Sequence, residues 1–322
     1  MLALFTEDQT LIAETGARIA VGGRARARAV MRGLPSSGDP TPELMRDWSG
    51  LGVDETANGI GGSLIDGALL LEALGRQVDP TPFVPHYVAI QAAFAGGLPV
   101  SGLLERGVRL ALVTGEAGSS SGAGPGVPGC DMLVWLTPSE SLLVHPAETA
   151  TVSGIDPTRS WGAATFGSVI AQGERRDLAR ARATALIAAE LCGIGQGAID
   201  LAAAYACERY QFGKPIGSYQ AIGHRLAQAK SDVEAAWSLT LHACWAADHA
   251  PHDLIEAASA AKALAGDAAV TAAESCVQTF GGMGITLEAD PHLYLKRALA
   301  SDSWLGSSYE QRRSLARAVL AA

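Results

Sequence analysis

The carboxy-terminal half of the chain carries a strong helical pattern. From about residue 174, apolar or small residues recur every three or four positions, at Ile187, Leu191, Ile194, Ala198 and Leu201. This spacing puts them on one face of a long helix. Further helical runs extend from Pro215 through Trp245 and over about 252–280, and two shorter ones follow. Long helices with short connections predict a four-helix bundle over residues 166–322.

Residues 1–108 are also predicted to be helical, in shorter segments. Thr6 precedes two acidic residues, which is the pattern of a helix N-cap. LIDGALLLEALGRQ, residues 64–77, stays apolar over several helical turns, and the prolines of DPTPFVP then break it. This part is therefore predicted to form a helical domain.

Residues 109–165 follow a strand pattern instead. VRLALVTG, DMLVWLTP and ESLLVHP are short apolar runs of the strand type. Between the first two lies EAGSSSGAGPGVPG, whose small residues predict a flexible loop. The chain as a whole is thus predicted to be mostly α, with a small, reduced β domain between two helical ones.

Composition narrows the function classes. The net charge is −9 and no run is rich in lysine or arginine, which argues against nucleic acid and anionic membranes as partners. The five cysteines are scattered without metal-ligand spacing, so no metal site is expected. No secretory signal pattern and no bilayer-length apolar run is found, and we expect a cytoplasmic protein.

Two short segments interrupt the helices with residues suited to binding. ERYQFGKPIGSYQAIGHRLA contains Arg209, whose planar fork can pair with a phosphate, next to Gln211 and Phe212. QTFGGMGITLEADPHLYLKRA contains Gln278 one turn before glycines that let a backbone approach a ligand. Taken singly, each fits an ordinary helix corner better than a binding site: Arg209 would cap the end of a helix, and the glycines would close a tight turn.

Together, the two segments resemble those of the acyl-CoA dehydrogenase family in order and separation. GGSLIDGALLLEALGRQVDPTPFVP resembles a third family segment. The resemblance implies non-covalent FAD and oxidation of the α,β bond of an acyl-CoA thioester. It implies that Arg209 contacts the FAD pyrophosphate across a subunit interface and that Gln211 and Phe212 neighbour the flavin. It also implies that Gln278, Gly281 and Gly282 hold the diphosphate and adenosine side of FAD from the other subunit of the interface.

The family's catalytic glutamate has no counterpart at either of its usual positions. That glutamate removes the α-proton while the flavin takes the β-hydride. Counted without gaps, one position is Gly306 and the other is Ala183. The nearest carboxylates to Gly306 are Asp302 and Glu310, either of which would share its face if the turn is helical.

The missing base predicts a subunit rather than a complete enzyme. Some bacterial members that act on steroid-derived acyl-CoAs pair a catalytic chain with a shorter, related one, and this chain resembles the shorter partner. We therefore expect it to complete an FAD site for a paralogous catalytic subunit, with an electron-transfer flavoprotein as acceptor. The alternatives are a homomeric dehydrogenase whose base is Asp302 or Glu310, and a non-catalytic scaffold of the same fold.

Overall fold

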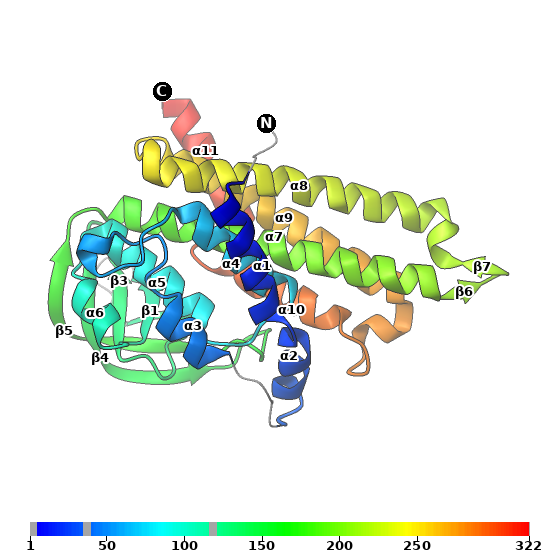
Figure 1. The fold of residues 1–322 in the computed structure, drawn as a ribbon, viewed down its shortest axis with the longest axis horizontal. Coiled ribbons are helices and arrows are strands. Elements are labelled where there is room, and N and C mark those ends of the chain that lie inside the picture. Colours follow the sequence, from blue (N-terminus) through cyan, green and yellow to red (C-terminus); the bar gives the residue numbers. More distant parts are fainter. Residues whose placement is uncertain (1–4, 35–39, 116–120, 322) are drawn as a thin grey trace.

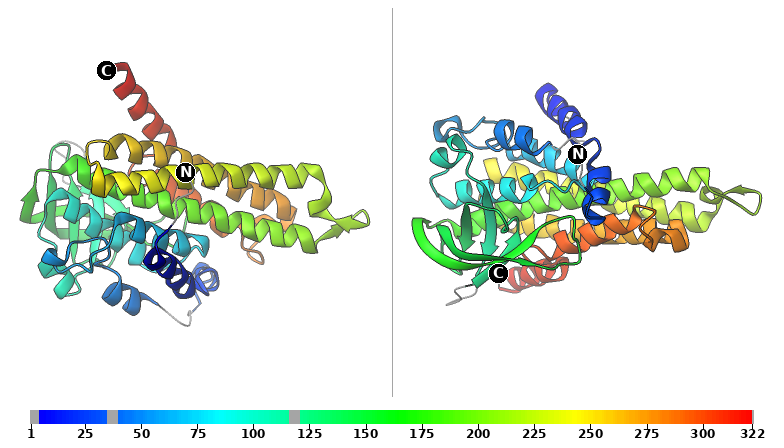
Figure 2. Two further views of the ribbon diagram at one scale, coloured as in Figure 1. Left: turned by 45° about the horizontal axis from the view of Figure 1, so that its top comes forward. Right: turned by 90° about the horizontal axis from the view of Figure 1, so that it is seen from below.

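The computed structural model describes residues 5–34, 40–115 and 121–321. A helical region, a β-barrel and a long helical bundle follow one another along the chain (Figure 1). The barrel lies at one end of the bundle and a small hairpin projects from the other, as the further views agree (Figure 2). The predicted mostly α fold with a small β part is confirmed.

The amino-terminal region is built from helices, as predicted. They are α1 (Glu7–Ala20), α2 (Gly23–Met31), α3 (Thr41–Asp47), α4 (Leu64–Arg76), α5 (Phe83–Gly96) and α6 (Ser101–Glu105). Thr6 caps α1: its hydroxyl accepts from the Gln9 backbone N–H, and the Gln9 side chain accepts from the Thr6 N–H. After α4, the chain restarts with Pro85 in the first turn of α5, where a missing N–H is tolerated.

The β region is a closed barrel. Its strands are β1 (Leu110–Thr114), β2 (Ser121–Pro125), β3 (Met132–Leu136), β4 (Ser141–Val152) and β5 (Trp161–Gly173), in the order β1-β2-β5-β4-β3. The pair β1 and β3 is parallel, with Leu110 opposite Met132, and the other pairs are antiparallel. Trp135 is buried inside, edge-on to Phe166 at 5.4 Å between ring centroids.

The barrel differs from the sequence prediction in two strands. β2 lies within the segment predicted as a flexible loop, and β5 was not predicted. Neither strand shows alternating apolar residues, because β2 is made of small residues and much of β5 is exposed. The two strands form through backbone pairing with each other, from Ser121–Thr165 to Pro125–Trp161. β5 continues to Gly173, past residue 165. Residues 116–120 of the predicted loop, including Glu116, lie outside the described residues.

The bundle contains α7 (Arg176–Glu208), α8 (Gln220–His249), α9 (Leu254–Phe280), α10 (Pro291–Ser303) and α11 (Ser308–Ala321). Of the described helices, only α7 is long and apolar enough to span a membrane, yet 89% of its apolar window is buried, so it is the core helix of the bundle. Pro215 does not open α8 as predicted. It ends a hairpin of β6 (Tyr210–Gln211) and β7 (Lys214–Pro215), and α8 begins only at Gln220.

A buried cluster of charges joins the three parts. Arg297 of α10 hydrogen-bonds the carbonyl of Asp79, which follows α4, and pairs with Asp156 in the β4–β5 connection. Arg159 in the same connection pairs with Glu190 of α7. Because buried charges are stable only when paired, these contacts fix the barrel and the amino-terminal helices against the bundle.

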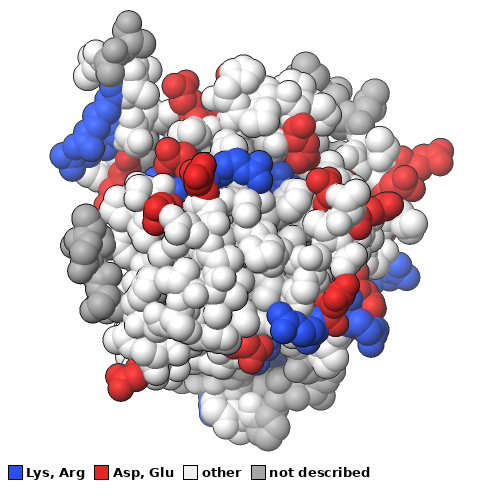
Figure 3. Space-filling view, turned by 90° about the vertical axis from the view of Figure 1, so that its left-hand side faces the viewer, with Lys and Arg blue, Asp and Glu red and all other residues white. Residues whose placement is uncertain are grey.

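The surface at the barrel end shows no concentration of one charge sign. Seen from that side, acidic and basic side chains are scattered around a broad uncharged area (Figure 3). The described residues on this face form no basic stripe of the kind that follows a nucleic acid backbone.

Candidate functional site

The first candidate segment forms the turn at the far end of the bundle. Arg209 is the residue directly after α7, and β6 and β7 carry the chain out and back. At the hairpin tip, Phe212 and Gly213 have φ values of 51° and 80°. Positive φ is ordinary for glycine but uncommon for phenylalanine. The Phe212 ring projects outward from this tight turn, and the residue is 92% exposed.

The second segment lies beside the first because their helices pack together. α9 ends at Phe280, whose ring stacks on Tyr205 of α7 with 3.9 Å between centroids. The chain then turns through Gly281, with φ 64°, into a 3-10 helix, Gly281–Ile285. A Cβ placed at Gly281 or Gly282 would meet no atom within 4 Å, so this backbone faces open space.

The two segments enclose an open hollow of about 440 Å³, called here the bundle-end hollow. It is lined by Tyr205, Arg209, Gln211, Ile216, Thr279, Phe280, Gly281, Gly282 and Met283. Among the described residues, the exposed Arg209 guanidinium makes no hydrogen bond or ion pair. An unpaired arginine beside accessible glycine backbone fits a phosphate group. The residues present therefore fit the diphosphate part of FAD.

Two predicted residues of this group lie outside the hollow. Gln278 is exposed on the last turn of α9, and Phe212 projects from the hairpin tip. The structure thus brings Arg209, Gln211, Gly281 and Gly282 together within one chain, while Gln278 and Phe212 face outward.

Gly306, one of the two positions at which the sequence comparison predicts the family's base, lies in a strained turn between α10 and α11. Leu305 and Gly306 have φ values of 59° and 97°. Arg180 Nη2 and Gln311 Nε2 donate to the Leu305 carbonyl at 2.6 and 3.0 Å, and Lys262 Nζ donates to the Gly306 carbonyl at 3.2 Å. Side chains from several helices therefore hold a conformation that a non-glycine residue at 306 would resist.

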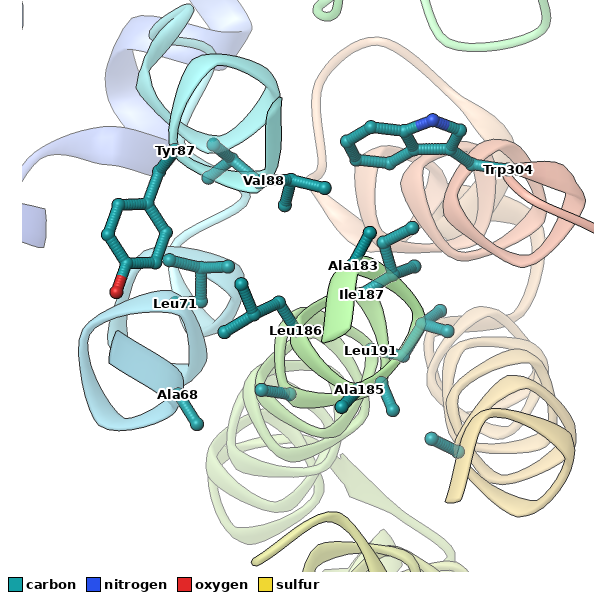
Figure 4. Close-up of a cluster of buried hydrophobic side chains, with 14 of the residues drawn as sticks. Ala68, Leu71, Tyr87, Val88, Ala183, Ala185, Leu186, Ile187, Leu191 and Trp304 are labelled. Carbon is teal, nitrogen blue, oxygen red and sulfur yellow. The ribbon is translucent and has the colours of Figure 1, made fainter. Parts of the chain in front are cut away.

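Ala183, the other position predicted for the base, is fully buried in α7. In the close-up, the ring of Trp304, directly after α10, projects toward the face of α7 that carries Ala183 and Ile187 (Figure 4). This face is an apolar packing surface. The sequence left the role of Trp304 open, because a lone tryptophan has no distinguishing pattern there.

Asp302 and Glu310 both have structural partners. Asp302 Oδ1 accepts from the Ser308 N–H at 3.0 Å and lies 3.7 Å from Lys262 Nζ. Glu310 Oε2 accepts from the Ser307 N–H at 2.9 Å, which caps α11. Hydrogen bonds from the Ser307 backbone and hydroxyl hold the pKa of Glu310 below its ordinary value. A lowered pKa favours the ionised carboxylate but weakens it as a base.

Glu190 is fully buried and bonded. It accepts from Arg159 Nη1 at 2.9 Å and from the Ser301 hydroxyl at 3.1 Å. Burial alone would raise the pKa of Glu190, but the charges of Arg159 and Arg297 outweigh it and hold the pKa below its ordinary value. Glu190 therefore belongs to the structural charge cluster. No group of three metal-ligating side chains is found in the part of the chain that the structure describes.

A closed barrel set against a helical bundle, with an anion-fitting hollow at the bundle end, agrees with the fold expected for an acyl-CoA dehydrogenase. The model of the acyl-CoA dehydrogenase C-terminal domain matches residues 175–320. IpdE2 of Mycolicibacterium smegmatis, an acyl-CoA dehydrogenase, is 31% identical over 96% of this chain and 98% of its own length. The chain therefore belongs to the acyl-CoA dehydrogenase family, whose members oxidise CH–CH bonds with FAD.

Other relatives agree. IpdE2 of Mycobacterium tuberculosis is 32% identical over 96% of both chains, whereas the equally similar FadE34 of that organism is covered over only 47% of its length. The fold matches the ChsE4–ChsE5 complex from M. tuberculosis with a TM-score of 0.84 at 19% identity, covering 100% of both chains. It also matches the Tcur3481–Tcur3483 steroid enzyme with a TM-score of 0.82 at 23% identity, covering 98% of both.

Proposed function

We propose that this chain is the subunit of a heteromeric acyl-CoA dehydrogenase that completes the FAD site for a paralogous catalytic chain. The observation that carries the proposal is the pairing of an intact bundle-end hollow with two base positions that lack a carboxylate. Arg209 remains available for a phosphate, while Ala183 is buried and Gly306 lies in a turn held by three side chains.

The residues of the hollow have distinct tasks in this proposal. The Arg209 fork pairs with the FAD diphosphate, and the open backbone at Gly281 and Gly282 permits close approach of the same group. Gln278 and Phe212, which face outward, reach a flavin held mainly by the partner chain. FAD, when bound, supplies the hydride acceptor for oxidation of the acyl-CoA.

The catalytic carboxylate is supplied by the partner in this proposal. Abstraction of the weakly acidic α-proton needs a base in contact with the substrate. Relatives of this chain carry names that point to pairs of chains and to steroids, the ChsE4–ChsE5 complex and the Tcur3481–Tcur3483 steroid enzyme. We infer a steroid-derived acyl-CoA as substrate and an electron-transfer flavoprotein as acceptor, in the cytoplasm.

A second candidate function is a self-sufficient homomer with Glu310 as base. Its specific support is position: a Cβ at Gly306 would lie 3.6 Å from Glu310 Oε2, so this carboxylate occupies the neighbourhood of the usual glutamate. The lowered pKa of Glu310 and its capping role count against it. Asp302, tied to Ser308 and Lys262, has less freedom to act.

The deciding experiment is purification of this chain alone and together with the paralogous chain encoded beside it. Flavin absorbance, subunit masses and acyl-CoA oxidation are measured in each preparation. We expect flavin and activity only in the mixed assembly, with fewer flavins than subunits. An active, yellow homomer that loses activity in the Glu310→Gln variant would instead establish the second candidate.

The hollow itself is tested by substitution. In the mixed assembly, Arg209→Ala should lower the FAD content, because a hydrogen-bonded charge pair contributes roughly 1.5–3 kcal/mol to binding. Gln278→Ala should lower it less. Arg225→Ala, which removes an exposed arginine of α8 outside the hollow, is the matched control. Full flavin occupancy in the Arg209 variant would show that this hollow does not hold FAD.

A further inference from the structure

Three arginines of the amino-terminal region lie along α2 and at its end. Arg24, Arg28 and Arg32 follow one another at intervals of four residues, which places them on one face of the helix. They contact residues 281–290, called here the cradle segment, which runs from the bundle-end hollow to the start of α10 (Figure 1). The contacting residues are 255 and 262 positions apart in the sequence.

These contacts, called here the arginine clamp, hold the α10 end of the cradle segment. Arg28 donates from Nε to Asp290 Oδ1 at 2.8 Å and from Nη2 to Oδ2 at 2.6 Å. Arg24 Nε lies 3.2 Å from the same Oδ2, and Arg32 Nη2 donates to the Leu287 carbonyl at 2.5 Å. The Asp290 side chain is only 7% exposed. The Arg28–Asp290 pair is therefore a bidentate, largely buried contact of the strong and geometrically specific kind.

The cradle segment is otherwise poorly buried. Of its ten residues, only Gly284, Ala289 and Asp290 are buried. Its first half is held on α9, where Gly284 lies so close that a Cβ would meet the Val277 carbonyl at 2.5 Å. Segments with few buried apolar groups open locally at a low free-energy cost. The order of the second half therefore depends on the arginine clamp.

The position of this segment matters for binding, because the part that faces the bundle-end hollow is backbone. Gly281 and Gly282 offer a ligand an uncovered main chain, whose place depends on where the whole segment lies. The α9 side is fixed by the stacking of Phe280 on Tyr205. A preformed site binds more tightly than one that has to be ordered first. Loosening the α10 end should therefore weaken binding without removing a contact to the ligand.

We propose that the arginine clamp positions the cradle segment for FAD, so that side chains of the amino-terminal region set the affinity of a site that they do not line. The inference rests on the proposed function, since it takes the bundle-end hollow as the place of the FAD diphosphate. Arg28 is the main positioning residue, because its fork binds both carboxylate oxygens of Asp290.

The first test measures FAD binding by the mixed assembly of this chain and its paralogous partner. Arg28→Ala should raise the FAD dissociation constant about two- to twentyfold, which is the range for residues that act through a neighbouring element. Arg28→Lys keeps the charge but loses the fork, so it should restore little of the affinity. An unchanged constant in Arg28→Ala would overturn the proposal. So would full affinity in Arg28→Lys, because charge alone would then attract the diphosphate.

A matched control separates positioning from a general loss of stability. Arg312 of α11 forms an ion pair with Asp267 of α9, and its side chain is 50% exposed, against 42% for Arg28. Arg312→Ala should leave the FAD dissociation constant unchanged, even where thermal melting shows the two variants to be equally destabilised. An equal loss of FAD affinity in both variants would attribute the effect to stability and overturn the clamp.

Hydrogen exchange of the full chain without FAD gives a readout that needs no bound cofactor. In Arg28→Ala, the amides of residues 283–288 should exchange roughly threefold faster or more, because the segment opens more often. Exchange in α8, which lies outside the clamp, should not change. Unaltered exchange in the cradle segment would contradict its dependence on Arg28.

Arg209→Ala in the same binding assay distinguishes the two proposals. Weaker FAD binding in Arg209→Ala but not in Arg28→Ala would leave the bundle-end hollow as the FAD site and overturn the clamp alone. Unchanged FAD binding in Arg209→Ala would overturn the proposed role of the hollow, and the clamp would then have no FAD site to position.

Discussion

Gly193 lies on the face of α7 that packs against α4, where the helices are too close for a side chain. A Cβ at Gly193 would collide with the backbone carbonyl of Glu72, and one at Gly197 would collide with that of Arg76. The close approach lets the core helix bury its length with small residues. Sequence pattern alone cannot reveal this, because glycine in a helix reads only as a weak helix former.

We predict that Gly193→Ala destabilises the protein by about 1–3 kcal/mol, because the two helices must move apart. Gly223→Ala in α8 is the control: its nearest obstacle is the Gly217 carbonyl at 3.5 Å, so it should add about 0.5–1 kcal/mol of stability. Urea unfolding measures both. Equal effects of the two substitutions would show that the α4–α7 contact is not as tight as described.

The candidate site residues also differ in whether the sequence alone could reveal them. Arg209, Gln211, Gly281 and Gly282 were predicted from the sequence because they stand in recognisable segments, and the structure places them around one hollow. Arg180, by contrast, is one of several arginines in RRDLARARAT, and nothing in that run distinguishes it. Its hydrogen bond to the Leu305 carbonyl is visible only in the tertiary structure.

At the scale of elements, the α10–α11 turn depends on a buried lysine. Lys262 of α9 has no exposed surface, and its Nζ donates to the carbonyls of Asp302 and Gly306 at 2.7 and 3.2 Å. Burial lowers its pKa to about 8, although the charge of Asp302 opposes the shift.

This lowered pKa predicts a pH-dependent stability. The unfolded chain keeps the Lys262 proton up to a pKa of about 10.4, so between about pH 8 and 10 the unfolded state binds more protons than the folded state. The unfolding free energy contributed by Lys262 must therefore rise with pH in this window. Urea unfolding of wild type and Lys262→Met at about pH 7 and about pH 9.5 measures it. A difference between the two proteins that stays constant or falls would contradict the prediction.

The buried charge cluster gives a second prediction for elements. Glu190→Ala leaves Arg159 and Arg297 without their shared carboxylate and should cost about 3–5 kcal/mol. The double variant Arg159→Met with Glu190→Leu should cost less, since the Arg159 charge is removed together with Glu190 and Arg297 keeps its ion pair with Asp156. Thermal and urea unfolding of both variants tests this, and a double variant worse than the single one would refute the explanation.

The strands show where element prediction fails. β1 and β3 are buried apolar runs, and both were predicted. β2 and β5 were missed, because a strand of small or exposed residues is held by hydrogen bonds to its neighbours rather than by its own side chains.

At the scale of the whole molecule, the end of the bundle carries an exposed apolar surface. Large apolar residues gather there with little burial: Tyr210, Phe212, Met283, Ile285 and Leu287. Such a concentration on two neighbouring turns is the pattern expected of a protein–protein interaction surface. Its position beside the bundle-end hollow suits a flavin shared between subunits.

We predict that Phe212→Asn weakens assembly while leaving the isolated chain as stable as before. The ring is 92% exposed, so its loss should change the unfolding free energy by no more than about 0.5 kcal/mol. Asparagine tolerates the positive φ of this turn, which keeps the hairpin intact. Sedimentation of the mixed assembly and its flavin content are the measurements. Undiminished assembly would exclude the hairpin tip from the interface.

The sequence by itself determined the helical bundle, the family and the segments around Arg209 and Gln278, because helical periodicity and short motifs are local properties of the chain. It also determined that carboxylates are missing at Ala183 and Gly306. Only the tertiary structure decided the closed barrel, the buried charge cluster and the turn that holds Gly306. Those features depend on which distant groups become neighbours, and burial gives each charge its partner or leaves it without one.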